Sequence, residues 1–205
     1  MAPSDEEPDP ALGGVPAATA QRDLTACLEA GAAGQLTSGH WMGPTSRVQL
    51  VDPLPSYRVL IAGSDLHRAL EDGLSTWLVG QGPSGQLVSG SLPRDPDNAS
   101  GPNAWVGEVD GRPNPSGLTV EYLCGGIGNP NLDGTGTPVY AMTLIGRLKA
   151  GIVRVTAHYQ GQPEQDAVAT AGVWFSQVQR GPGAGALTVH GYDADGNEIA
   201  LRSLN

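Results

Sequence analysis

The hydrophobic positions of this chain follow a helical spacing near its beginning. In the segment T-A-Q-R-D-L-T-A-C-L-E-A-G-A-A, residues 19–33, the positions of Leu24, Cys27 and Leu28 are i, i+3 and i+4. This spacing places the three side chains on one face of a helix. Gly31 follows the apolar stripe and is expected to end the helix. We therefore predict one helix here, with Cys27 on its buried side.

After this helix the pattern changes to short apolar or alternating runs, separated by glycine, proline, asparagine and aspartate. Such runs are typical of β-strands joined by turns. We expect ten or eleven strands, at residues 46–52, 57–62, 75–80, 86–92, 104–109, 118–124, 139–148, 152–159, 167–178, 186–193 and 198–203. The sequence predicts an all-β fold, an antiparallel β-sandwich or barrel of about ten short strands with one N-terminal helix.

Alternation within residues 152–159 indicates which side of that strand faces water. Apolar side chains alternate there with polar ones: Val153, Val155 and Ala157 against Arg154, Thr156 and His158. Because successive side chains of a strand point to opposite faces, the polar set is expected on a solvated face.

The two cysteines, Cys27 and Cys124, are predicted to form a structural disulfide. Cys124 ends an apolar row in residues 118–124, so a helix packed on that row would bring Cys27 within bonding reach. The alternative is two buried free thiols. A bond closing so long a loop contributes about 4–5 kcal/mol in the chain-entropy model and is typical of an oxidising compartment.

The first 18 residues differ in composition from the rest of the chain. They contain four carboxylates and four prolines and few apolar residues, so we predict a disordered acidic, proline-rich spacer over residues 1–18. Residues 19–205 are predicted to form a single β-sandwich domain.

The start of the chain lacks the basic and apolar regions of a signal peptide. We expect a chain whose leader or anchor was removed; a cytoplasmic protein is the alternative.

Composition and charge restrict the partners. The chain has 205 residues with 30 glycines and 17 prolines, and its formal net charge is -10 at pH 7. Its eleven Lys and Arg residues are scattered without a run of three. We therefore do not expect nucleic acids or anionic membrane surfaces as partners, because a protein binds either of them through clustered cations. No run approaches the roughly 18 apolar residues of a membrane span.

Several segments resemble ligand sites but have simpler explanations. In Y-D-A-D-G-N, residues 192–197, the spacing of an EF-hand fails, and Asp195 with Gly196 predicts a hairpin turn. The oxygen-rich residues 93–103 and the glycine-rich residues 124–138 are expected to be surface loops. The four histidines have no metal-ligand spacing. We expect no metal, no cofactor and no catalytic residue.

The segment S-G-H-W-M-G-P holds the possible contact residues, His40 and Trp41. Trp41 is expected in a loop, where an exposed indole would be available to a partner. The alternative is a loop residue that covers one end of the sandwich.

The last third of the chain carries I-V-R-V-T-A-H-Y, A-G-V-W-F and V-H-G-Y-D-A-D-G. It resembles uncharacterised exported or membrane-tethered domains of GC-rich Gram-positive bacteria, in which similar strands close a β-sandwich. The resemblance covers residues 150–202 and implies a place outside the cytoplasm. It transfers no catalytic residue.

These observations together predict a non-enzymatic extracytoplasmic domain with a sensory or protein-interaction role at the cell envelope. Its partner would be an unidentified protein or cell-envelope ligand. The alternatives are a structural or decoration module of a larger assembly, and a cryptic hydrolase. A buried cluster of histidines and carboxylates would favour the hydrolase.

Overall fold

The computed structural model describes residues 9–33, 49–64, 75–93, 103–106, 117–120, 122–127, 140–180 and 184–204. The chain divides into two compact units, Met1–Val109 and Asp110–Asn205. Each unit has a hydrophobic core of its own. We predicted one sandwich domain over residues 19–205, whereas only the second of these two units is a sandwich.

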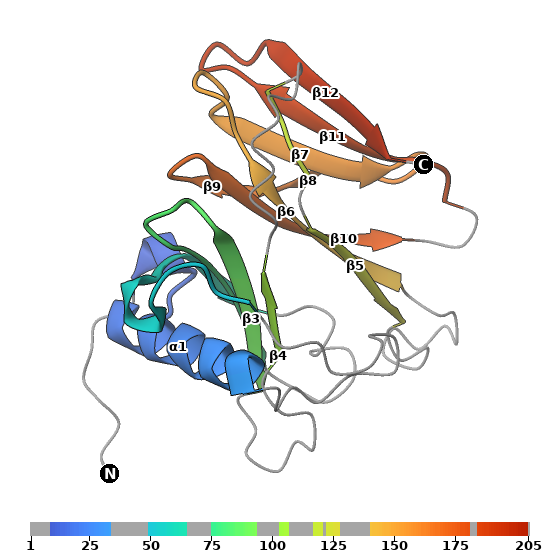
Figure 1. Ribbon diagram of the computed structural model, residues 1–205. Coiled ribbons are helices and arrows are strands. Elements are labelled where there is room, and N and C mark those ends of the chain that lie inside the picture. The colour runs from blue at the N-terminus through green and yellow to red at the C-terminus, as the bar shows by residue number, and fades with distance from the viewer. Residues whose placement is uncertain are drawn as a thin grey trace. The chain divides into compact units, whose positions relative to one another are not determined.

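The first unit packs one helix on one sheet. Helix α1 (Ala17–Ala33) lies across a four-stranded antiparallel sheet with the order β1-β2-β3-β4 (Figure 1). These strands are β1 (Arg58–Ser64), β2 (Ser75–Gln81), β3 (Leu87–Pro93) and β4 (Asn103–Val106). The predicted apolar stripe is confirmed, because Leu24, Cys27 and Leu28 are buried in the core with Leu78 and Val88.

The helix is longer than predicted at both ends. It begins at Ala17 and continues beyond Gly31, which is buried inside it, to Ala33. Leu12 and Val15 precede the helix and are also buried in the first core. The predicted boundary at residue 18 therefore lies within α1, while residues 1–8 lie outside the described residues.

The strand predicted at residues 46–52 is wrong over the part that the structure describes. Residues 49–52 have no strand pairing, and a short 3-10 helix, η2 (Leu54–Ser56), follows. The amide side chain of Gln86 holds this segment: Val51 N donates to Gln86 Oε1 at 3.1 Å, and Gln86 Nε2 donates to Gln49 O at 3.1 Å. Side-chain bonds thus replace a sheet ladder here.

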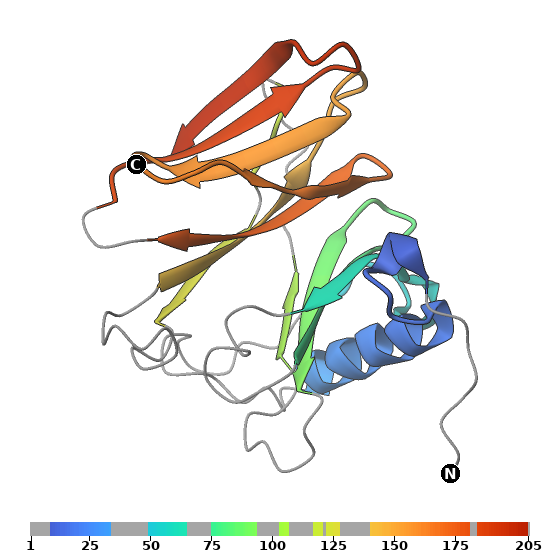
Figure 2. The ribbon, with the colours of Figure 1, turned by 180° about the vertical axis from the view of Figure 1, so that it is seen from behind.

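The second unit is a sandwich of two four-stranded antiparallel sheets, with the orders β5-β6-β10-β9 and β12-β11-β7-β8. Its core contains residues of both sheets, such as Trp174, Val155 and Val189. Figure 2 shows the two sheets of this unit as layers. The bounds are β5 (Tyr122–Ile127), β6 (Tyr140–Arg147), β7 (Arg154–Tyr159), β8 (Gln165–Asp166), β9 (Val168–Thr170), β10 (Val173–Arg180), β11 (Leu187–Tyr192) and β12 (Glu198–Leu204).

The all-β prediction is confirmed. The described residues form three open antiparallel sheets and one α-helix, and the sheets do not close into a barrel. No helix among the described residues is long and apolar enough to cross a membrane.

Two turns near the end of the chain determine how its strands pair. The single strand predicted at residues 167–178 is two strands, because Ala171 (φ 48°) and Gly172 (φ 77°) form a turn between β9 and β10.

The predicted hairpin tip after Tyr192 is confirmed. There Gly196 has a φ of 83°, and the Asp193 carboxylate accepts bonds from the backbone N–H groups of Asp195 and Asn197. Asp193 therefore belongs to the turn.

The centre of the sandwich depends on close packing around Trp174. Trp174 is fully buried, and its Nε1 donates a hydrogen bond to Thr119 O at 2.9 Å. Gly146 is the residue paired with Trp174 on β6. A Cβ atom at Gly146 would lie 1.8 Å from Thr119 O and 2.5 Å from Trp174 Nε1. Only glycine fits at this position without moving the strand or the indole.

We predict that Gly146→Ala lowers the free energy of unfolding by about 2–3 kcal/mol, because the added methyl group overpacks a well-filled core. Chemical denaturation measures the change. Gly63→Ala is the matched control, since a Cβ atom there meets nothing within 4 Å. Equal effects of the two substitutions would contradict this packing.

Candidate functional site

The outer face of the sheet β12-β11-β7-β8 carries a group of polar side chains that contact one another. On β7, Val155 and Ala157 are buried in the core, while Arg154 is exposed and His158 is half-buried on the opposite face. The predicted alternation is correct for these four residues and wrong for two others, because Val153 is 58% exposed and Thr156 is fully buried. We name this surface the outer face and assign to it Arg154, Thr156, His158, Glu164, His190, Tyr192 and Glu198.

The register between β7 and β11 brings two histidines together. Thr188 pairs with His158, and His190 pairs with Thr156, so the histidines are diagonal neighbours. Their ring centroids lie 5.2 Å apart with an interplanar angle of 11°. Diagonal pairs on one sheet face are close enough for rings to touch.

The row of rings continues along β11 and ends at a guanidinium group. The Tyr192 ring stacks on His190 with centroids 6.3 Å apart. Arg154 Cζ lies 5.1 Å from the centroid of the Tyr192 ring, and Arg154 Nε bonds Asp166 Oδ1 at 2.8 Å. Aromatic and cationic groups therefore lie in one row across two strands.

Glu164 enters the outer face from the connection between β7 and β8. Its Oε2 accepts hydrogen bonds from the Thr156 hydroxyl at 2.9 Å and from the Tyr192 hydroxyl at 3.3 Å. The Thr156 hydrogen bond lowers the pKa of the Glu164 carboxyl, with smaller contributions from His190, Tyr192 and His158 against the opposing effect of burial. The Glu164 side chain is therefore a carboxylate at neutral pH.

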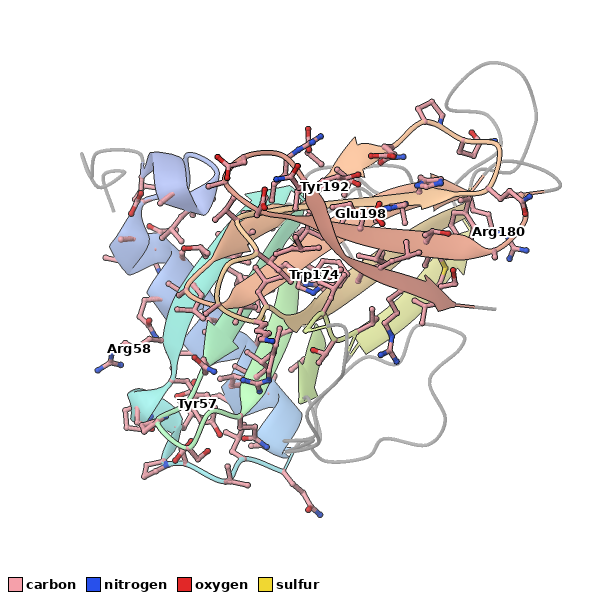
Figure 3. The ribbon with its side chains drawn as sticks, turned by 90° about the horizontal axis from the view of Figure 1, so that it is seen from above. Tyr57, Arg58, Trp174, Arg180, Tyr192 and Glu198 are labelled. Atoms are coloured by element: carbon pink, nitrogen blue, oxygen red, sulfur yellow. The ribbon has the colours of Figure 1, made fainter. Side chains whose placement is uncertain are left out.

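A β-bulge positions Glu198 beside His190. Tyr192 pairs with Glu198 while Gly191 pairs with Ala200, so Ile199 is an extra residue in β12. Such a bulge changes the side on which the following residues emerge. Glu198 Oε2 lies 2.7 Å from His190 Nδ1. Figure 3 labels Tyr192 and Glu198, which lie close together on the two strands.

Three side chains of this face could hold a metal ion. One ligand atom from each of His158, Glu164 and His190 can be chosen so that all three lie within 4.8 Å of one another. His158 Nδ1 and His190 Nε2 are shielded from solvent and have no hydrogen-bond partner. Two imidazoles and a carboxylate are a ligand set that Zn²⁺ accepts.

A separate cavity of about 480 Å³ lies at one end of the sandwich, lined among others by Met142, Tyr159, Arg180, Leu187 and Leu204. Arg180 Cζ lies 5.5 Å from the centroid of the Tyr159 ring. Burial raises the pKa of the Tyr159 hydroxyl, and the Arg180 charge opposes this increase. None of the residues lining this cavity belongs to the outer face.

The predicted contact residues His40 and Trp41 lie outside the described residues. Cys27 is buried in the first unit, whereas Cys124 is on β5 of the second unit and its side chain is outside the described set. Within the part of the chain that the structure describes there is no disulfide bond. The Cys27–Cys124 bond therefore stays a prediction.

Sequence reasoning missed the cluster of His158, Glu164 and His190, although it placed His158 on a polar face. The two histidines are 32 positions apart along the chain, and no motif spacing joins them. The sequence did carry a signal that both histidines point outward, namely the alternation of apolar and polar residues. Leu187 and Val189 alternate with Thr188 and His190, so both histidines belong to outward-facing sets. The missing information was that β7 and β11 are neighbours.

We predict that Thr156→Val raises the pKa of the Glu164 carboxyl toward its ordinary value, because the donor that is the largest cause of the decrease is lost. A lowered pKa stabilises the fold above the ordinary glutamate pKa, and this contribution disappears as pH falls through the folded-state pKa. In the variant, that acid-dependent loss of stability becomes smaller. Carbon-13 NMR of the Glu164 carboxyl measures the titration. Thr188→Val, on the same face, should leave it unchanged; a shift equal to that of Thr156→Val would contradict the assignment.

Comparison with known proteins found no matching family model, no similar curated protein and no similar solved structure. The resemblance of residues 150–202 to exported domains therefore stays a prediction.

Proposed function

We propose that this chain is a non-enzymatic recognition domain of the cell envelope, and that its contact surface is the outer face. One observation carries the proposal: His158, His190, Tyr192 and Arg154 form a continuous row on an open sheet surface. Tyrosine and arginine are enriched where proteins contact partners, because each combines a large contact area with hydrogen bonds.

The setting of this row supports recognition more than catalysis. Enzymes usually enclose small substrates in concave sites. The cavity at the end of the sandwich is lined by other residues, including Arg180. A second cavity of about 290 Å³, lined among others by Lys149 and Ile152, also contains no residue of the outer face. The row lies on the outside of the sheet, where a large partner has access to it.

The proposed location rests on different observations. The resemblance of residues 150–202 to exported domains supports a place outside the cytoplasm. The formal net charge of -10 supports a partner other than nucleic acid or an anionic membrane surface. A protein or an uncharged or cationic envelope polymer is the partner class that we propose.

We predict that the full chain co-sediments with cell-envelope fractions in buffer containing EDTA, and that Tyr192→Ala weakens this binding at least tenfold. Loss of a central aromatic contact costs about 2 kcal/mol or more, which exceeds the tenfold equivalent of 1.4 kcal/mol. Arg154→Ala should also weaken binding.

Arg22→Ala is the charge-matched control for Arg154→Ala, because Arg22 is an exposed residue of α1. Binding that is unchanged in both outer-face variants, or equally reduced in the Arg22 variant, would overturn the proposed contact surface. A chain that does not bind any envelope fraction would overturn the recognition role itself.

A metal-assisted hydrolase is the second candidate function, and the cluster of two histidines and a carboxylate is the observation that favours it. Three protein ligands with an open position are typical of hydrolytic zinc sites. In that case 4-nitrophenyl acetate or bis(4-nitrophenyl) phosphate should be hydrolysed faster with Zn²⁺ and protein than with Zn²⁺ alone, and His190→Ala should abolish the difference. Rates equal to those of free Zn²⁺ for both substrates would remove this candidate.

A further inference from the structure

We propose that His158, Glu164 and His190 form a binding site for a divalent transition-metal ion, with Zn²⁺ the ion of choice, and that Glu198 is a positioning residue for His190. The site shares the outer face with the proposed function, but the inference goes beyond it because metal binding needs no partner protein.

The first observation that supports the metal site is that its three side chains come from separate segments of the chain and meet on one face. His158 comes from β7, Glu164 from the β7–β8 connection and His190 from β11, yet their ligand atoms lie within 4.8 Å of one another. Around Zn²⁺, with bonds of about 2.0–2.1 Å, tetrahedral ligand atoms lie roughly 3.3 Å apart. Each side chain must therefore move by about 1 Å or less to close around the ion. Glu164 is exposed, which leaves its side chain room to move.

The second support is independent and concerns two nitrogen atoms. His158 Nδ1 and His190 Nε2 are shielded from water and lack a hydrogen-bond partner. Buried polar atoms are almost always paired, so an unpaired one in a native protein requires an explanation such as strain, a functional role, an ion or an ordered water. We assign these two nitrogens as the imidazole ligands of the site.

Glu198 determines the tautomer of the His190 imidazole, and metal binding requires that tautomer. A carboxylate only accepts hydrogen bonds, so the 2.7 Å contact with Glu198 Oε2 places the proton on His190 Nδ1. In the neutral ring the lone pair is then on Nε2, the unpaired atom. A ligating histidine whose other nitrogen donates to a carboxylate is a recurrent arrangement, and it raises the basicity of the ligand.

The charges around the site favour a cation. Glu164 and Glu198 contribute two carboxylates beside the two histidines. Arg154, the nearby cation on β7, is bonded to Asp166 on β8, which offsets its charge. The remaining formal charge of the chain is also negative. A cation therefore meets little electrostatic opposition.

The chemical types of the three ligand atoms favour some metal ions over others. Two imidazole nitrogens and one carboxylate suit Zn²⁺ and other late first-row ions, whereas Ca²⁺ and Mg²⁺ prefer six or more oxygen ligands. Three protein ligands leave a coordination position for water or for a group of a partner.

The test titrates the EDTA-treated, dialysed full chain with Zn²⁺, measured by calorimetry and by competition with a chromophoric chelator. We expect one tight site in the wild type, at least a hundredfold weaker binding in His158→Ala and His190→Ala, and no comparable heat with Ca²⁺. Glu198→Gln should weaken binding by about 10–100-fold.

Two matched controls separate this site from the other groups of the chain. Glu29→Gln makes the same charge change as Glu198→Gln on an exposed position of α1 and should bind Zn²⁺ like the wild type. His67→Ala removes a histidine that is not one of the three proposed ligands, with the same expectation. No tight site in the wild type, or tight binding that survives in both His158→Ala and His190→Ala, would overturn the proposal.

A measurement on the wild type keeps the proposal testable if a variant does not fold. Cadmium-113 bound to the wild type should give one resonance in the shift range of nitrogen and oxygen ligands, and a shift typical of sulfur ligands would overturn the site. Envelope binding is measured in EDTA and zinc binding without envelope material, so failure of one proposal is distinguishable from failure of the other.

Discussion

Pairing between β7 and β11 is the constraint on which the outer face depends. In this register, Thr188 lies opposite His158 and Thr156 lies opposite His190. A slip of one residue in either strand would turn its histidine toward the core and expose its valine, Val155 on β7 or Val189 on β11, both of which are fully buried. Burial of these apolar residues therefore determines where the histidines lie. The packing of Trp174 over Gly146 maintains the second sheet against which this core forms.

The polar groups of the outer face are ordered by contacts with one another. Thr156 and Tyr192 hold Glu164, Glu198 holds His190, and Asp166 holds Arg154. Exposed pairs of this kind contribute little to stability, because solvent screens them and side-chain entropy opposes them. These contacts instead fix the positions of the side chains, and they leave His158 Nδ1 and His190 Nε2 without partners. The proposed recognition by the row of rings and the proposed binding of a metal ion both depend on this arrangement.

Much of the fold could be predicted from local pattern, and the errors have physical causes. The stripe of Leu24, Cys27 and Leu28 identified the helix, but packing on the sheet overrides the low helix propensity of Gly31. The turn at Ala171 was missed because an alanine with positive φ is uncommon, so the sequence reads as one apolar strand. The outer-face cluster was not predictable from alternation alone, since it also requires the order of the strands in the sheet. Local alternation identifies the outward side chains and does not identify their neighbours.

The most direct test of this account is the tautomeric state of His190, read from a long-range ¹H–¹⁵N spectrum of the metal-free protein at neutral pH. The contact with Glu198 predicts that the neutral ring carries its proton on Nδ1 and not on Nε2. A proton on Nε2 with a bare Nδ1 would show that Glu198 does not orient the ring, and it would contradict both the described geometry of the outer face and the metal site inferred from it.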